Sequence, residues 1–175
     1  MNVFVLNSGR CGSTTFIRAC GHISNYSSAH ESRVRLVGAD RFAYPDNHIE
    51  ADNRLSWLLG RLQRHYADQA CYVHLSREAE SCAESFVKRS HFGIMKAYRE
   101  GILMETGHPS EKELARDYLD TVESNIALFL SDKTRVYPVR LERAEADFRL
   151  FWEAIGAHGD LDAALAEWGV RHNAS

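Results

Sequence analysis

Residues 2–15 read NVFVLNSGRCGSTT, and this stretch predicts the fold of the chain. It starts with a short apolar run rich in β-forming residues, which predicts a buried strand. Residues 16–20 then carry apolar side chains at helical spacing, and Gly9 and Gly12 lie between the two elements. A strand, a glycine-containing turn and a helix N-terminus direct backbone N–H groups and the positive end of a helix dipole toward one point. The stretch therefore predicts a phosphate-binding turn.

The side chains of the turn also favour an anion. Arg10 supplies a fixed positive charge. The hydroxyl groups that follow it belong to Ser13, Thr14 and Thr15. The turn is not a Walker A sequence, because Ser13 follows Gly12 where that motif has lysine, and no lysine occurs before Lys88. The sequence thus disfavours an ATP- or GTP-hydrolysing P-loop, and the plain alternative is a tight turn with Ser13 as the helix N-cap.

The turn resembles the 5′-phosphosulfate-binding loop of the sulfotransferase family, in which a basic residue and one spacer precede a Gly-Thr/Ser-Thr run. Residues 10–15, RCGSTT, fit this pattern with one extra residue in the Ser/Thr run. The resemblance implies that the turn binds the sulfuryl donor 3′-phosphoadenylyl sulfate (PAPS), with Arg10 beside the leaving oxygen. The residues to which it assigns donor binding are Arg10, Cys11, Gly12, Ser13, Thr14 and Thr15.

A second segment extends the resemblance. Residues 70–75 predict a buried strand that ends near Arg77, and residues 79–89 predict a helix. In sulfotransferases an arginine at a strand end and a serine eight positions later contact the donor's 3′-phosphate, and Arg77 and Ser85 stand at that separation. Arginine can bind phosphate through two N–H groups. The family usually has Asp-Pro after the arginine, whereas this chain has Glu-Ala, so we expect the turn from the strand to the helix to differ. Taken singly, Arg77 and Ser85 would each also suit an ordinary surface position.

Sulfuryl transfer needs a base that accepts a proton from the acceptor. In glycan-modifying sulfotransferases a glutamate ends the strand before the arginine strand, and the resemblance implies Glu50 for this role, although the Lys-Thr-Pro part of that motif is missing. Asp52 shares the side of an ideal strand with Glu50. Cytosolic small-molecule sulfotransferases use a histidine in this region, which implies His48. The order of preference is Glu50, Asp52 and His48; the alternative is that the carboxylates pair with Arg54 or another cation.

Composition fits one compact domain over residues 1–175, with 45% hydrophobic residues and three prolines. The formal net charge of −3 gives no reason to expect nucleic-acid binding. The four cysteines form no Cys-x-x-Cys pair, and neither they nor the histidines have metal-ligand spacing, so no metal is expected. No signal peptide or membrane-spanning run is recognised, so we expect a cytoplasmic location.

Strands and helices are expected to alternate along the chain. The expected strands are at 2–6, 33–37, 47–51, 70–75 and 135–141. The expected helices are at 13–24, 54–67, 79–89, 92–105, 110–130, 144–155 and 161–168. This order predicts an α/β fold of three layers, with a mostly parallel sheet of about four to five strands flanked by helices, like that of P-loop NTPases. Ligands of such sheets bind beyond the carboxyl ends of the strands.

The resemblance, carried by residues 2–89, implies a small bacterial-type sulfotransferase. It would move a sulfuryl group from PAPS to a hydroxyl or amine, leave 3′-phosphoadenosine 5′-phosphate, and use no metal. The sequence leaves open the oligomeric state and the acceptor, a small molecule, glycan or lipid that residues 91–108 are expected to contact. The family's late basic loop implies donor contact by Arg171, with a frayed tail as the alternative. Two other functions stay open: a nucleotide or small-molecule kinase with a non-Walker phosphate loop, and a non-catalytic nucleotide-binding protein of the same fold.

Overall fold

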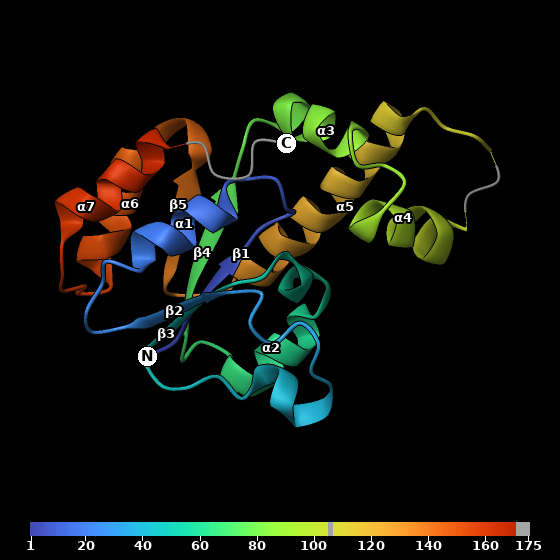
Figure 1. Cartoon of the computed structure of the whole chain (residues 1–175). Coiled ribbons are helices and arrows are strands. Elements are labelled where there is room, and N and C mark those ends of the chain that lie inside the picture. Colours follow the sequence, from blue (N-terminus) through green and yellow to red (C-terminus); the bar gives the residue numbers. More distant parts are fainter. Residues whose placement is uncertain (105–106, 171–175) are drawn as a thin grey trace.

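The computed structural model describes residues 1–104 and 107–170. At its centre lies a five-stranded parallel sheet with the strand order β2-β3-β1-β4-β5 (Figure 1). The strands are β1 (Val3–Leu6), β2 (Ser27–His30), β3 (His48–Ala51), β4 (Cys71–Ser76) and β5 (Val136–Arg140). The predicted α/β class, a parallel sheet with flanking helices, is confirmed.

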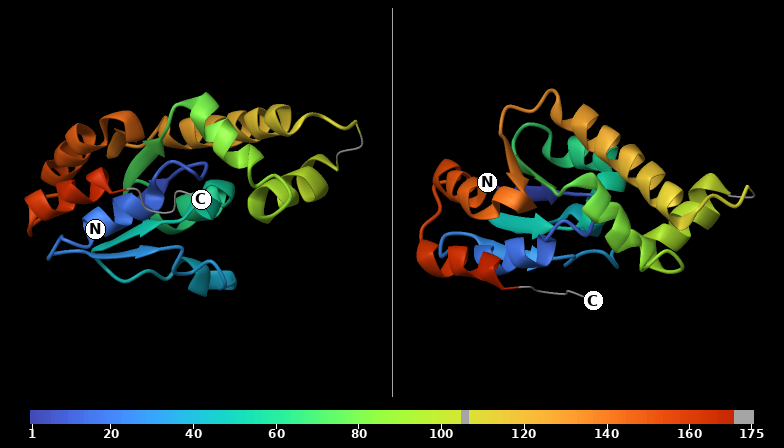
Figure 2. Two further views of the ribbon diagram at one scale, coloured as in Figure 1. Left: turned by 45° about the horizontal axis from the view of Figure 1, so that its top comes forward. Right: turned by 90° about the horizontal axis from the view of Figure 1, so that it is seen from above.

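Helices cover both faces of the sheet. They are α1 (Ser13–Cys20), α2 (Leu59–Tyr66), α3 (Ala79–Val87), α4 (Gly93–Ala97), α5 (Glu111–Leu130), α6 (Ala144–Ala154) and α7 (Leu161–Ala166). α1, α6 and α7 lie on one face and α2 and α5 on the other, as Figure 1 shows. Figures 1 and 2 show α4 on the side of the molecule away from α6 and α7.

Short helical segments complete the connections. They are η1 (Gly38–Phe42), η2 (Asn53–Trp57), η3 (Tyr98–Leu103), η4 (Leu141–Arg143) and η5 (Glu167–Gly169). η3 is a π-helical turn, and its Tyr98 hydroxyl donates to the Asp117 carboxylate of α5 at 2.5 Å. Among the helices of the described ranges, none is long and apolar enough to span a bilayer.

β1 is the centre of the core, and all four of its side chains are fully buried. Because β3 and β4 flank it and helices cover both faces, each of its side chains has to be apolar. On the α2 face, the Phe4 ring lies 4.6 Å from that of Tyr66. On the other face, Phe16 of α1 lies 5.3 Å from both Phe148 and Phe151 of α6. These contacts hold α2 against β1 and α1 against α6.

The predicted edge strand at 33–37 is wrong. The edge strand is β2, whose sequence SSAH pairs in parallel with β3 from Ser27 to His30. Its polar, partly exposed side chains lack the apolar alternation by which a strand is recognised from sequence. Residues 33–35 form a turn instead.

Several predicted helices are shorter or divided. The helix expected at 13–24 ends at Cys20, where Gly21 is the C-cap. The helix expected at 54–67 is broken at Leu58 into η2 and α2, and that at 92–105 consists of α4 followed by η3. In contrast, α5 starts where the sequence placed it, because Ser110 and Glu113 form a capping box.

Substitution of Gly159 tests the packing between the segment before α7 and the segment after α1. It forms a bridge with Ile23 and has a φ of +139°, and a Cβ there would lie 2.1 Å from the His22 carbonyl oxygen. We expect Gly159→Ala to lower the free energy of unfolding in urea by about 3 kcal/mol or more, because backbone must move. Gly156→Ala is the control, since Gly156 also has positive φ but open space around a Cβ, and about 1 kcal/mol is expected. Equal losses would contradict this packing.

Candidate functional site

Side chains hydrogen-bond the backbone carbonyl groups of the turn that follows β1. Asn7 accepts from Ser56 Oγ (3.0 Å), Ser8 from Tyr118 Oη (2.7 Å), and Gly9 from Cys11 and Cys82 Sγ (3.1 and 3.3 Å). These carbonyls are therefore bound from within the protein, and the N-terminus of α1 follows the turn. Gly12 rather than Ser13 is the N-cap, and it makes no side-chain cap bond. A glycine-containing turn followed by a helix N-terminus has the chemistry to bind an anion, so residues 7–12 are the candidate anion-binding turn.

The backbone of the turn requires its two glycines. Gly9, Arg10 and Gly12 have positive φ angles of 94°, 61° and 88°. A Cβ on Gly9 would lie 2.9 Å from Asn53 Nδ2, and one on Gly12 would lie 2.9 Å from Leu141 Cδ1. Neighbouring side chains thus lie close against the turn, and its curved backbone has room only for glycine at these positions.

Arg10, Arg77 and Ser85 lie together beside the turn. Arg10 Nε donates to Ser85 Oγ at 2.8 Å, and Arg77 Nη1 lies 3.5 Å from the Arg10 carbonyl oxygen. Within the part of the chain that the structure describes, neither arginine forms an ion pair with a carboxylate. Burial, and then repulsion from Arg89 and Arg77, lowers the pKa of the Arg10 guanidinium. A bound anion would offset both effects, so the residues present fit phosphate groups.

The structure thus brings together the two sequence segments for which donor contacts were predicted. Ser13 and Thr14 are partly exposed at the start of α1, whereas Thr15 is buried. The Cys11 side chain is buried beneath the turn. Arg171 lies outside the described residues. Among those residues, no group of three or more His, Cys, Asp or Glu side chains is arranged to hold a metal ion.

The three side chains predicted as candidate bases lie inside the protein. Glu50 is fully buried, and its carboxylate accepts hydrogen bonds from the N–H (2.7 Å) and Oγ (2.6 Å) of Ser32. His48 Nε2 lies 3.0 Å from the same carboxylate. Asp52 is also fully buried, pairs with Arg41 and caps η2, so a cation partner is observed for it. The role of these residues as base stays a prediction, and their present contacts hold neighbouring loops to the sheet.

His30 is a residue of the site that the sequence patterns did not single out. It ends β2, its side chain is exposed, and its Nε2 lies 3.0 Å from Ser13 Oγ at the start of α1. It pairs in register with Ala51 and so points to the α1 face, whereas Glu50 points to the α2 face. An exposed imidazole beside the turn has the chemistry to accept a proton from a bound acceptor. Recognition of 27–30 as a strand would have placed His30 at a ligand-binding strand end.

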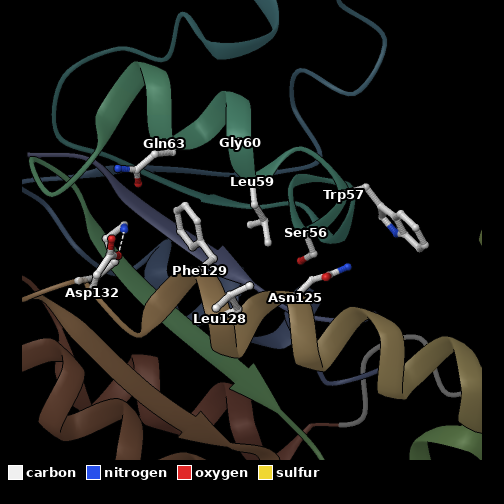
Figure 3. Close-up of a pocket in the computed structure, with 10 residues that line it drawn as sticks. Ser56, Trp57, Leu59, Gly60, Gln63, Asn125, Leu128, Phe129 and Asp132 are labelled. Carbon is white, nitrogen blue, oxygen red and sulfur yellow. Dashed lines mark hydrogen bonds and ion pairs between the residues drawn. The ribbon is translucent and has the colours of Figure 1, made fainter.

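A groove of about 500 Å³ lies between α2 and α5, on the face of the sheet opposite α1 (Figure 3). Its lining combines apolar and aromatic side chains with amides, and includes Trp57, Leu59, Leu128, Phe129, Gln63 and Asn125. Ser56, which holds the Asn7 carbonyl, also lines it. Ser56 therefore connects the lining of the groove to the turn that follows β1.

The sheet order defines a parallel α/β fold, in which the turn after β1 lies beside the arginine after β4. Among solved structures, the chain is similar to the "Sulfotransferase Domain from the Curacin Biosynthetic Pathway", with a TM-score of 0.67 and 15% sequence identity over 97% of this chain and 78% of that chain. At this identity the likeness shows the fold alone, and the chain has a sulfotransferase-like fold. No protein-family model matches the chain, and no curated protein matches it in sequence.

Tyr118→Phe tests whether the carbonyl contacts hold the turn in shape. It leaves the Ser8 carbonyl without its donor, so we expect a loss of about 1–2 kcal/mol in unfolding free energy and weaker binding of 3′-phosphoadenosine 5′-phosphate. Tyr26→Phe is the matched control, because its hydroxyl donates to the Ile155 carbonyl (3.2 Å), away from the turn. Urea unfolding and titration calorimetry measure the two effects. If both variants bind the nucleotide like the wild type, the contact does not shape the site.

Proposed function

We propose that the chain is a PAPS-dependent sulfotransferase that transfers a sulfuryl group to a hydroxyl or amine acceptor. The observation that carries the proposal is the meeting of the anion-binding turn with Arg77 and Ser85. The hydrogen bond between Arg10 and Ser85 joins the turn to α3 at 2.8 Å, although the two residues lie far apart in sequence. Two phosphate positions are thus available side by side: the turn for the 5′ end of the donor, and Arg77 with Ser85 for a 3′-phosphate.

The proposed reaction breaks the bond between sulfur and the 5′-phosphate oxygen and forms a bond from sulfur to the acceptor oxygen or nitrogen. Negative charge develops on the leaving phosphate oxygen. Arg10 and the N–H groups of the turn stabilise that charge, because they are held in place before the reaction. The acceptor's proton passes to a base, and 3′-phosphoadenosine 5′-phosphate leaves.

His30 is the first candidate for the base. It is exposed beside Ser13, whereas Glu50 and Asp52 are fully buried and already hydrogen-bonded. A base has to reach the acceptor within hydrogen-bond distance, and a buried carboxylate with occupied oxygens does so only after its contacts break. Glu50, Asp52 and His48 remain candidates from the resemblance to sulfotransferases.

The acceptor side is proposed to include the segment around α4 and η3. Four of its large apolar side chains are exposed: Phe92, Ile102, Leu103 and Met104. This exposed apolar surface suits an acceptor with an apolar part, whether a small molecule, a glycan derivative or a lipid. All four cysteines are free, which fits the proposed cytoplasmic, reducing location.

The two alternative functions make different demands on the site. A kinase needs ATP with magnesium, but Asp52, the carboxylate that follows β3, is buried and paired with Arg41. A non-catalytic nucleotide-binding protein would bind the bisphosphate nucleotide without turnover. Calorimetry that compares 3′-phosphoadenosine 5′-phosphate with ATP plus magnesium distinguishes a kinase from the proposed sulfotransferase. Turnover assays with PAPS distinguish a non-catalytic nucleotide-binding protein from it.

Arg77→Ala tests the donor assignment. The wild type is expected to bind 3′-phosphoadenosine 5′-phosphate more tightly than AMP, because Arg77 contacts the 3′-phosphate. Loss of a charged contact costs on the order of a few kcal/mol, so the variant should bind the bisphosphate about tenfold or more weakly and lose the preference. Arg149→Ala, at an exposed position on α6, is the matched control and should bind both nucleotides like the wild type. Equal affinity of the wild type for both nucleotides would overturn the proposal.

His30→Ala tests the base. We expect turnover with PAPS across a panel of alcohols and amines to fall by about a hundredfold, with bisphosphate binding near that of the wild type. Exposed His158→Ala is the control and should keep full turnover. Glu50→Gln keeps the shape of the buried side chain and is expected to act mainly on stability. If Glu50→Gln folds stably but loses turnover while His30→Ala stays active, Glu50 is the base.

A further inference from the structure

Two thiols meet beneath the anion-binding turn. Cys11 of the turn and Cys82 of α3 have their sulfur atoms 4.0 Å apart, and both sulfurs donate to the Gly9 carbonyl oxygen at 3.1 and 3.3 Å. Both side chains are 1% exposed. No such contact between sulfurs is found for Cys20 or Cys71 among the described residues, so these two buried thiols provide an internal comparison.

We propose that Cys11 and Cys82 form a disulfide when a peroxide oxidises the protein, and that this bond closes the anion-binding turn to its ligand. The Cys11 sulfur attacks one oxygen of the peroxide; the O–O bond breaks and water leaves. The Cys82 sulfur then attacks the oxidised Cys11 sulfur, the S–O bond breaks, and a second water leaves with the Cys82 proton. The two thiols together lose two electrons, and hydrogen peroxide is reduced to two waters.

The surroundings of the pair suit this order of steps. The contact with the Cys82 sulfur lowers the pKa of Cys11 against the opposing effect of burial, and the same contact raises the pKa of Cys82. The positive charge of Arg77 favours the thiolate as well. Cys11 is therefore the attacking sulfur and Cys82 the resolving one. Only a small oxidant reaches sulfurs this deeply buried, and an anion bound in the turn should slow the reaction.

The expected effect on the turn follows from distances. A disulfide has an S–S length of about 2.05 Å, so the sulfurs have to approach by about half of their present separation. The Gly9 carbonyl then loses both of its thiol donors. The turn moves toward α3, where Ser85 holds Arg10. This consequence rests on the proposed function, because it assumes that the turn binds the donor nucleotide.

Peptide mapping tests the bond itself. The folded wild type is treated with hydrogen peroxide, and the remaining peroxide is quenched. The protein is then unfolded in the presence of N-ethylmaleimide, which alkylates free thiols, and digested with trypsin, which places each cysteine in a separate peptide. The expected product joins residues 11–18 to residues 78–88, with Cys20 and Cys71 alkylated. Absence of the joined peptide, or equal oxidation of all four cysteines, overturns the proposal whatever the protein binds.

Calorimetry with 3′-phosphoadenosine 5′-phosphate tests the consequence. Oxidised wild type should bind about tenfold or more weakly, and dithiothreitol should restore the affinity. Cys82→Ser keeps a donor to the Gly9 carbonyl but cannot form the bond, and Cys82→Ala serves if that variant is unstable; neither should show the reversible loss. A joined peptide with unchanged affinity overturns the closure of the turn. Failure of the reduced wild type to bind overturns the proposed function instead, while the peptide map still decides the bond.

Discussion

The shape of the candidate site depends on hydrogen bonds from side chains to the backbone carbonyls of residues 7–9. The donors come from η2, α5, α3 and the turn itself, which lie far apart in sequence. A buried carbonyl without a partner costs free energy, so these bonds decide which way the peptide groups face. The shape of the turn is thus a property of the whole packed fold and not of its glycines alone.

The acidic and basic side chains near the sheet lie in different places: the buried carboxylates face α2, and two arginines lie at the ends of strands. Register pairing places Glu50 beside Phe4, on the face that α2 covers, and His30 beside Ala51, on the face that α1 covers. The carboxylates of Glu50 and Asp52 are matched by Ser32, His48 and Arg41 within the protein. Arg10 and Arg77 instead lie at the carboxyl ends of β1 and β4 without such a partner among the described residues. Positive charge is therefore concentrated at this edge of the sheet, beside the Glu123 carboxylate that pairs with His74.

The sequence predicted the parts of the fold whose physics is local. β1, the turn and α1 follow from an apolar run, two glycines and a helical pattern, and α5 starts at its capping box. β2 was missed because SSAH has no apolar alternation, and only pairing with β3 makes it a strand. The same omission hid His30. The hydrogen-bond partners of Glu50 could not be predicted from the sequence either, because Ser32 lies in a turn whose path depends on tertiary packing.

The Gly9 carbonyl is the weakest of the three anchoring points. The Asn7 and Ser8 carbonyls each accept from a hydroxyl, at 3.0 and 2.7 Å, whereas Gly9 accepts only from two thiols at 3.1 and 3.3 Å. A thiol is a weaker hydrogen-bond donor than a hydroxyl, so the two sulfurs together hold this carbonyl less firmly. Gly9 also has a left-handed backbone, and the glycine can leave that conformation at little cost. The turn is therefore held most firmly where it leaves β1, and its shape changes most easily next to Arg10.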